Sequence, residues 1–488
     1  MSISPFKLIT YKGISVAFDL KFKDITDGVS DSVSSIANET TILANRVVDN
    51  HICIGVTGFS GSGKSTFITS LIHQLRYSNE ATLGGFLPAR DQKIVNVELL
   101  PLNGLELFDY QHGIESLASS PPKWPRPTST LSGCIVEITY KRDSLFSGII
   151  GKTTKLKIEI RDYPGEWLLD IPLLEQDYLS WCRESADILN QPQRKALMGS
   201  LFSDLQSISP FDKLSDHDLD NLCQRYSDFL KVSKLHGLTL IQPGHMLLPS
   251  SSDSFDQFFP LLGLQHYDKK ALEDADHESV YKVMKSRYIT YLNDIVKPFH
   301  HDFFKSIDRQ VILIDSLKAL SGGKDNFEDM MIAFSRIIDS YRVGSSNFVS
   351  KLFSPKVERI IFLSSKPDRV LMNQHENLRY LTNNIINRVC RQSIRNTIQI
   401  ETEIACSVRC TEDNNSYLTA VLSNGQKGQL AHPEIPEKIP TDEQWAQFEN
   451  WKPHELQPPI ISNLQHGGRL PSIRMDKVLK DLIGDKFS

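Results

Sequence analysis

The sequence lacks the features that mark several large classes of protein. Its apolar runs fall short of the roughly 18 residues that a membrane-spanning helix needs, and its first residues, MSISPFKLITYKG, lack the two regions of a signal peptide. Seven cysteines are scattered along 488 residues, which argues against a disulfide framework. A net charge of −5 offers no general attraction for nucleic acid. We therefore expect a reduced, cytoplasmic protein with no nucleic-acid partner and no direct membrane insertion.

What the sequence does contain is a glycine-rich loop, GFSGSGKS, which matches the full phosphate-loop pattern. An apolar run at 52–56 predicts a buried strand before the loop, and apolar residues at helical spacing from 67 to 75 predict a helix after it. In such a loop the backbone N–H groups converge on phosphate oxygens, the lysine neutralises the outer phosphates, and the last hydroxyl binds Mg²⁺. The predicted nucleotide-binding residues are Gly58, Ser60, Gly61, Ser62, Gly63, Lys64, Ser65 and Thr66.

A second motif ends the alternating strand LKIEIRD. Asp162 and Gly165 form a DxxG pattern, in which the carboxylate orients Mg²⁺ and the glycine N–H contacts the γ-phosphate. The preceding segment CIVEITYKR reads as a strand paired with it, whereas the continuous apolar runs at 311–314 and 360–363 are typical of buried parallel strands. These patterns predict an α/β fold, a Ras-like P-loop core with a mostly parallel sheet and an antiparallel edge hairpin.

A base-reading motif follows the buried strand RIIFL. Ser365, Lys366 and Asp368 match [N/T]KxD with serine in the first place. Asp368 would accept the N1–H and the exocyclic amine of guanine, two donors that adenine does not offer, and the stem of Lys366 would pack over the base. Further on, IACSVRC would bring the backbone N–H groups of Ser407 and Val408 to the guanine O6. The sequence therefore predicts GTP or GDP with Mg²⁺, although KPD is also ordinary turn chemistry.

The switch region is less well defined by its sequence. Thr128 and Thr130 in KWPRPTST are candidates for the threonine that senses the γ-phosphate through Mg²⁺, and we favour Thr128. Arg126 is a candidate arginine finger or a solvated arginine. Glu166 stands where Ras-like proteins usually carry a water-orienting glutamine, so we expect slow hydrolysis. The predicted metal ligands are Ser65, Thr128 and Asp162, and the predicted catalytic residues are Lys64, Arg126, Thr128 and Gly165.

Several of these segments, together with others, resemble the YcjX-like family of bacterial stress-associated P-loop GTPases. The resemblance rests on GFSGSGKSTFITSL, WPRPT, IRDYPGEWLLD, DRQVILIDSLKAL, SSKPD, ACSVRCTED and RLPSIRMDKVLKDLIGDKF. It extends from about residue 50 to the end of the chain. It implies a cytosolic GTP-binding protein, and we expect a protein effector or activator as its partner. Since members are often encoded near a membrane protein of the stress response, a membrane protein is one candidate partner.

The pattern of elements divides the chain into five predicted parts. Residues 51–170 and 308–430 form the two halves of the GTPase core, and 1–50 form an N-terminal segment. Residues 171–307 form an insertion whose apolar spacing is helical, apart from a loop expected at QPGHMLLPSSSDS. Residues 431–488 form an extended tail that ends in a helix at about 475–483. The insertion either reports the nucleotide state to a partner or simply covers the site.

Three functions remain open from the sequence. The favoured one is a slow GTPase that switches a partner-binding surface between GTP and GDP states. A P-loop kinase acting on a small molecule would share the phosphate loop but would need an acceptor pocket and an adenine site. A scaffold plugged by nucleotide would bind without turnover.

Overall fold

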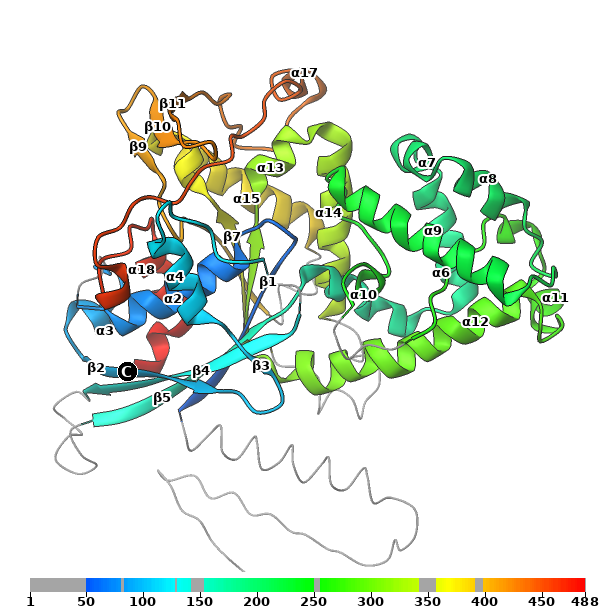
Figure 1. The fold of residues 1–488 in the computed structure, drawn as a ribbon, viewed down its shortest axis with the longest axis horizontal. Coiled ribbons are helices and arrows are strands. Elements are labelled where there is room, and N and C mark those ends of the chain that lie inside the picture. The colour runs from blue at the N-terminus through cyan, green and yellow to red at the C-terminus, as the bar shows by residue number, and fades with distance from the viewer. Residues whose placement is uncertain are drawn as a thin grey trace, which may run out of the picture. The chain divides into compact units, whose positions relative to one another are not determined.

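The computed structural model describes residues 50–79, 83–127, 130–141, 153–249, 255–341, 357–390 and 398–487. Its central sheet has the order β2 (Ile94–Pro101), β4 (Ser132–Lys141), β5 (Thr153–Asp162), β1 (His51–Gly58), β6 (Arg309–Ile314), β7 (Arg359–Ser365) and β8 (Gln399–Ala405), with β3 (Glu106–Leu107) beside β4. Neighbours from β5 to β8 are parallel, whereas β4 is antiparallel to both β5 and β2. The predicted parallel sheet with an antiparallel hairpin is confirmed, and β2 extends it by a further strand (Figure 1).

Helices cover both faces of this sheet. One face packs against α2 (Lys64–Arg76), α4 (Tyr110–Ala118) and α18 (Met475–Ile483), and the other against α14 (Gly323–Ser340) and α15 (His375–Val389). Within β1, Ile52 and Ile54 belong to the first buried cluster and Cys53 to the second. Because parallel strands are buried on both faces, they read as continuous apolar runs.

The insertion is built from helices that share their own buried apolar cluster, running from Leu173 to Val296 (Figure 1). They are α6 (Tyr178–Leu189), α7 (Pro192–Met198), α8 (Ser200–Ser207), α9 (Asp216–Leu235), α10 (Gly244–Leu247), α11 (Lys269–Glu273) and α12 (Val280–Tyr291). None of the helices in the described part of the chain is both long enough and apolar enough to span a bilayer.

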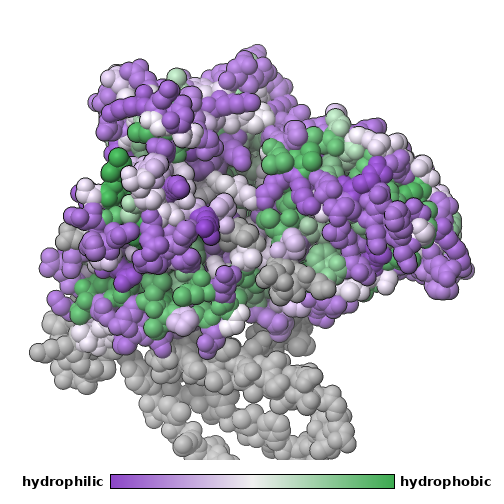
Figure 2. Space-filling model, viewed as in Figure 1, coloured by the Kyte–Doolittle hydropathy of each residue, from purple (hydrophilic) through white to green (hydrophobic). Residues whose placement is uncertain are grey.

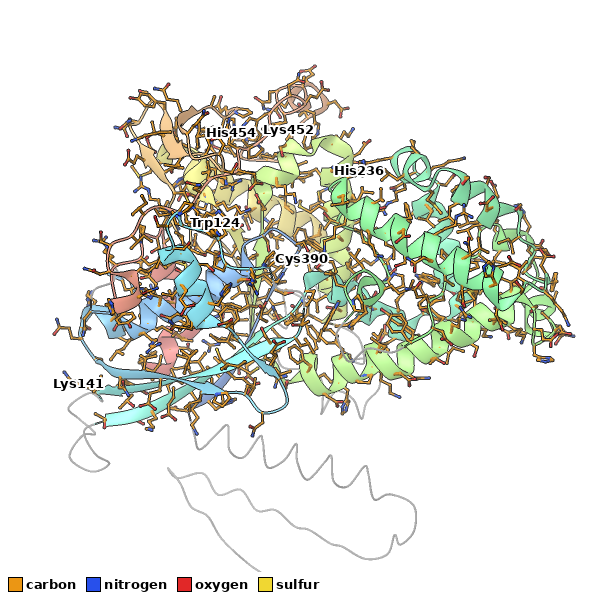
Figure 3. The ribbon with its side chains drawn as sticks, in the orientation of Figure 1. Trp124, Lys141, His236, Cys390, Lys452 and His454 are labelled. Carbon is orange, nitrogen blue, oxygen red and sulfur yellow. The ribbon has the colours of Figure 1, made fainter. Side chains whose placement is uncertain are left out.

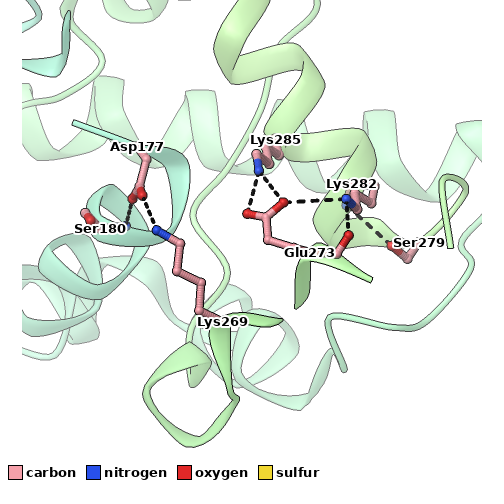
Figure 4. A network of polar contacts seen from close by, with 7 residues as sticks. All are labelled: Asp177, Ser180, Lys269, Glu273, Ser279, Lys282 and Lys285. Atoms are coloured by element: carbon pink, nitrogen blue, oxygen red, sulfur yellow. Dashed lines mark hydrogen bonds and ion pairs between the residues drawn. The ribbon is translucent and has the colours of Figure 1, made fainter. Parts of the chain in front are cut away.

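Several ion pairs lie on the surface of the insertion. Asp177 accepts from the Ser180 N–H (2.8 Å) to cap α6 and pairs with Lys269 (3.2 Å), while Glu273 pairs with Lys285 (2.7 Å; Figure 4). Exposed pairs of this kind contribute about 0–1 kcal/mol each. The aromatic and aliphatic cluster beneath them therefore holds the insertion together.

One sequence-based expectation about the insertion is wrong in part. The segment QPGHMLLPSSSDS, where only a loop was expected, contains the short helix α10, and its residues 250–254 lie outside the described residues. The backbone N–H groups of Gly244 and His245, in its first turn, donate to the two carboxylate oxygens of Asp170 (2.8 and 3.0 Å). Because this cap comes from a residue far away in the chain, no local signal announces the helix.

The last part of the chain returns to the core. After a small antiparallel sheet of β9 (Thr411–Asp413), β10 (Leu418–Val421) and β11 (Lys427–Leu430), it forms α17 (Asp442–Trp445) and then α18, the terminal helix that the sequence predicted. The indole N–H of Trp124 donates to the Leu456 carbonyl (2.7 Å), which ties the WPRPT loop to this tail (Figure 3). Most of the visible surface is hydrophilic, with an apolar band over the β2–β4–β5 region, where Val95 is 54% exposed (Figure 2).

Candidate nucleotide-binding site

The phosphate loop connects the carboxyl end of β1 to the first turn of α2. Gly63, just before the helix, has φ 94°, a left-handed conformation that costs glycine little. The buried Lys64 ammonium folds back to donate to the Gly58 carbonyl (2.9 Å). The Ser62 hydroxyl is buried and has no hydrogen-bond partner within the described residues. The loop therefore holds an ammonium group and a buried hydroxyl without a partner, and both groups could donate hydrogen bonds to phosphate oxygens.

Two more lysines approach the loop from the ends of β6 and β7. The Lys366 ammonium donates to the Gly61 carbonyl (2.7 Å) and to the Asp315 carboxylate (2.6 Å). The Lys318 Nζ lies 3.6 Å from the position that a Cβ on Gly61 would take. Because parallel strands end at one edge of the sheet, residues far apart in sequence gather here. The resulting concentration of positive charge suits a polyphosphate.

Asp315 keeps its charge in this cluster. Burial opposes its ionisation, but the charges of Lys366 and Arg369 outweigh burial and hold the pKa of Asp315 below its ordinary value. The same carboxylate accepts from the Lys318 N–H (3.1 Å) and so caps α13 (Ser316–Ser321). Asp315 therefore fixes the lysine of the base-reading motif against the phosphate loop.

Asp368 lies in the 3₁₀ turn Pro367–Arg369, which directly follows Lys366, and is 4% exposed. Its carboxylate accepts from the Cys410 N–H (2.9 Å), and its carbonyl accepts from the Thr411 hydroxyl (2.6 Å). Burial and the Asp368 charge raise the pKa of the Cys410 thiol well above its usual value, so that thiol stays neutral beside the carboxylate. The turn is thus braced by the loop that follows β8.

That loop also contacts the helix of the phosphate loop. The Ser70 hydroxyl of α2 donates to the Ser407 carbonyl (2.7 Å), and Val408 is buried in the same apolar cluster as α2. The structure therefore ties Ser407 and Val408 to α2, and their neighbour Cys410 to Asp368.

The DxxG segment meets the phosphate loop from the other side. Asp162 pairs with Val56 in the register of β5 and β1 and is buried. A Cβ on Gly165 would stand 2.8 Å from the Gly58 carbonyl carbon and 3.2 Å from the Phe59 nitrogen, so only glycine allows this approach. The carboxylate of Asp162 and the hydroxyl of Ser65 are hard oxygen donors of the kind Mg²⁺ prefers.

Glu166 is the residue whose position the sequence least anticipates. Its Oε1 accepts from the Ser60 N–H (3.3 Å) and hydroxyl (2.9 Å) and pairs with the Lys234 ammonium of α9 (3.2 Å). Burial opposes its ionisation, but the charges of Lys234 and then Lys64 lower the pKa of Glu166 below its ordinary value. An ionised carboxylate therefore sits directly on the phosphate loop.

The structure describes only some of the switch residues expected upstream. Thr128 lies outside the described residues, and the Thr130 hydroxyl donates to Glu106 (3.3 Å). Arg126 is exposed and makes no hydrogen bond or ion pair within the part of the chain that the structure describes. Arg126 and Thr128 therefore stay predictions.

Sequence reasoning missed Asp315, Lys234 and Asp170. Asp315 ends a buried strand, VILID, at the same edge as the phosphate loop, and that position was a usable signal. Lys234 and Asp170 carry no such signal, because their roles depend on how the insertion packs. A cavity of about 460 Å³ lies beside the DxxG segment and away from the loop, lined by Trp167, His245, Phe299 and others.

Comparison with known proteins identifies the family of this chain. The YcjX-like family, DUF463, matches residues 52–487. A protein of Escherichia coli K12 named Ras-like GTPase YcjX is 31% identical over 470 residues, which cover 93% of this chain and 99% of that protein. Its namesake in Shewanella oneidensis MR-1 is 30% identical over 479 residues, with 93% and 99% covered. The chain, with its Ras-like core, belongs to the YcjX-like family.

Proposed function

We propose that this chain binds GTP and GDP with Mg²⁺ between β1 and the ends of β6–β8, and that it hydrolyses GTP slowly. The observation that carries this proposal is the Lys366 ammonium, which joins the Gly61 carbonyl to Asp315 and so puts the base-reading turn against the phosphate loop. The relatives named Ras-like GTPase support it.

Each residue of the site has a role in this proposal. Lys64 neutralises the outer phosphates, the Gly165 N–H donates to the γ-phosphate, and Asp368 accepts the two guanine donors. Bound Mg²⁺ would be held by Ser65, Asp162 and Thr128 and would neutralise charge on the phosphates. Arg126 is the candidate finger. The remaining nucleotide contacts are Gly58, Ser60, Gly61, Ser62, Gly63, Thr66, Lys366, Ser407 and Val408.

Slow hydrolysis follows from Glu166. A neutral glutamine can orient a water while approaching a triphosphate, whereas an ionised carboxylate is repelled by it. Because Glu166 is buried, solvent screens that repulsion poorly. We expect turnover to rise when a protein partner moves this residue.

The proposal assigns switching to the insertion. Residues 51–170 and 308–430 would form the GTPase core, 171–307 the part that responds to nucleotide, and 1–50 and 431–488 the flanking segments. A protein effector or activator, with a membrane protein as one candidate, would read that response in the cytoplasm during bacterial stress. The motivating observation is that the segment after DxxG contacts α9 and α10 directly.

A competition titration tests the nucleotide assignment. Full-length, nucleotide-stripped protein with Mg²⁺ is loaded with a fluorescent GDP and challenged with GDP, GTP, ADP, ATP and XDP, in parallel with Asp368→Asn. We expect guanine nucleotides to win by at least about tenfold and the variant to shift toward xanthine. Equal competition by adenine nucleotides would remove the guanine assignment and favour a kinase. Guanine binding without phosphate release would favour a scaffold.

A further inference from the structure

An ion pair between the core and the insertion lies on the phosphate loop. Glu166 follows the DxxG segment of the core, whereas Lys234 belongs to the last turn of α9. Their side chains meet at 3.2 Å, with the glutamate 4% and the lysine 24% exposed. The C-terminal end of α9 is held at the core next to this pair, since Asn326 of α14 donates to the carbonyl of His236 (3.1 Å; Figure 3).

The carboxylate of Glu166 uses groups that a phosphate would use. It accepts from both the N–H and the hydroxyl of Ser60, in the middle of GFSGSGKS. Its second oxygen is buried and has no hydrogen-bond partner among the described residues. A like charge arriving at the same loop in a poorly screened site is strongly disfavoured. The carboxylate and a third phosphate therefore compete for one place.

A displacement of Glu166 cannot stay local. A Cβ on Gly244 would stand 2.0 Å from the Glu166 carbonyl oxygen and 3.2 Å from the Trp167 nitrogen, so α10 lies flush against this backbone. The Trp167 ring stacks on His245 at 4.3 Å. Asp170 accepts from His245 and from the Tyr291 hydroxyl (2.9 and 2.5 Å). Movement at Glu166 is therefore coupled to α10 and α12 through packed contacts.

We propose that Glu166 and Lys234 form a γ-phosphate sensor that joins the phosphate loop to the insertion. In the diphosphate state the Glu166 carboxylate accepts hydrogen bonds from Ser60 and pairs with the Lys234 ammonium. In the triphosphate state the third phosphate displaces Glu166 from Ser60, and the Lys234 ammonium pairs with that phosphate. The sensor rests on the proposed function, and it identifies Lys234 as a specificity-determining residue for GTP over GDP.

Binding affinities test the sensor without relying on turnover. The dissociation constants of GDP and of a slowly hydrolysed GTP analogue are measured on the full chain with Mg²⁺, for the wild type, Glu166→Gln, Lys234→Ala and Lys234→Arg. Lys231→Ala is the matched control, because Lys231 lies on the same helix and, among the described residues, pairs with Asp228 at the surface. Thermal unfolding of each variant checks its fold.

We expect Glu166→Gln to raise the preference for the triphosphate by about tenfold, because it removes the competing charge. Lys234→Ala should lower that preference by about fivefold, whereas Lys234→Arg and Lys231→Ala should leave it within about twofold. GDP affinity should change little in every variant. The sensor is overturned if Glu166→Gln and Lys234→Ala alter both affinities equally or leave the preference unchanged. Failure of the wild type to bind guanine nucleotides would instead overturn the proposed function.

Discussion

The two sides of the phosphate loop are built from different parts of the chain. On the side of the base-reading turn, Lys366 pairs with Asp315 at the ends of neighbouring core strands, and Asp368 is held by Cys410 and Thr411 of the core. On the opposite side, Glu166 and Asp170 follow one core strand but find most of their partners in the insertion. The core alone therefore supplies the first side, whereas the second side requires the insertion to be packed.

The two sides also differ in where the partners of their buried carboxylates come from. Asp170 is 0% exposed and accepts four hydrogen bonds from Gly244, His245 and Tyr291, all in the insertion. The Asp368 carboxylate accepts from the Cys410 N–H and interacts with the thiols of Cys406 and Cys410, all in the core. A fully satisfied buried carboxylate holds one arrangement firmly until its partners move together. These contacts support the proposal that the insertion side switches between discrete states while the base side stays constant.

The largest expected effect comes from removing the Asp170 carboxylate, the shared hydrogen-bond acceptor of the insertion side. Asp170→Ala leaves two N–H groups, an imidazole and a phenol without their acceptor, so the free energy of unfolding should fall by about 3–5 kcal/mol. Urea unfolding measures this loss. Lys269→Ala, which removes an exposed ion pair of the same insertion, should cost less than about 1 kcal/mol. A similar loss of unfolding free energy in both variants would contradict this central role of Asp170.

Acid should weaken the insertion side through Glu159. Burial opposes ionisation of this side chain, but its hydrogen bond to His51 and the charge of Arg161 lower its pKa to about 2. Arg161 in turn donates to the Phe303 carbonyl (2.6 Å) at the end of the insertion. Since the folded pKa lies below the unfolded value, the stabilisation is complete above about pH 4.5 and is lost as the pH falls toward 2.

The Glu159→Gln variant isolates the contribution of the ionised Glu159 carboxylate to the free energy of unfolding. Between pH 5 and pH 3 the wild type should lose about 2 kcal/mol more unfolding free energy than Glu159→Gln, as measured by urea unfolding at each pH. If the unfolding free energies of the two proteins fall equally with pH, Glu159 is not the acid-sensitive group.

On the base side, Asp315→Ala should act on affinity without changing selectivity for the third phosphate. Without the carboxylate, Lys366 loses the partner that holds it against the Gly61 carbonyl. GDP and the GTP analogue should both bind about tenfold more weakly in fluorescence titrations. Asp442→Ala, which breaks an exposed pair with Lys324, is the control. A change confined to the triphosphate would erase the distinction between the two sides.

Sequence patterns could predict the frame of the site and the base side. The apolar runs of the parallel strands, the phosphate loop and the amphipathic spacing of α18 are local signals, and the ends of parallel strands necessarily converge. They could not predict β2, whose mostly exposed residues do not alternate. Nor could they predict the Glu166–Lys234 pair, because it joins two residues through the tertiary packing of an insertion.

The smallest expected effect concerns the contact between α2 and the loop after β8. Ser70→Ala removes one hydrogen bond to the Ser407 carbonyl, a neutral interaction that contributes about 1 kcal/mol. GDP and GTP affinities should both fall by about threefold in the same titration. No change beyond experimental error would mean that Val408 packing alone positions this loop.

Hydrogen exchange tests the contrast between the two sides most directly. The full chain is compared in the presence of GDP and of a slowly hydrolysed GTP analogue, using peptides that cover residues 165–170, 234–247 and 405–411. We expect exchange in the first two to change by about tenfold or more between nucleotides, while the third stays protected equally in both. Identical exchange at 165–170 in the two states, or an equal change at 405–411, would contradict a constant base side and a switching insertion side.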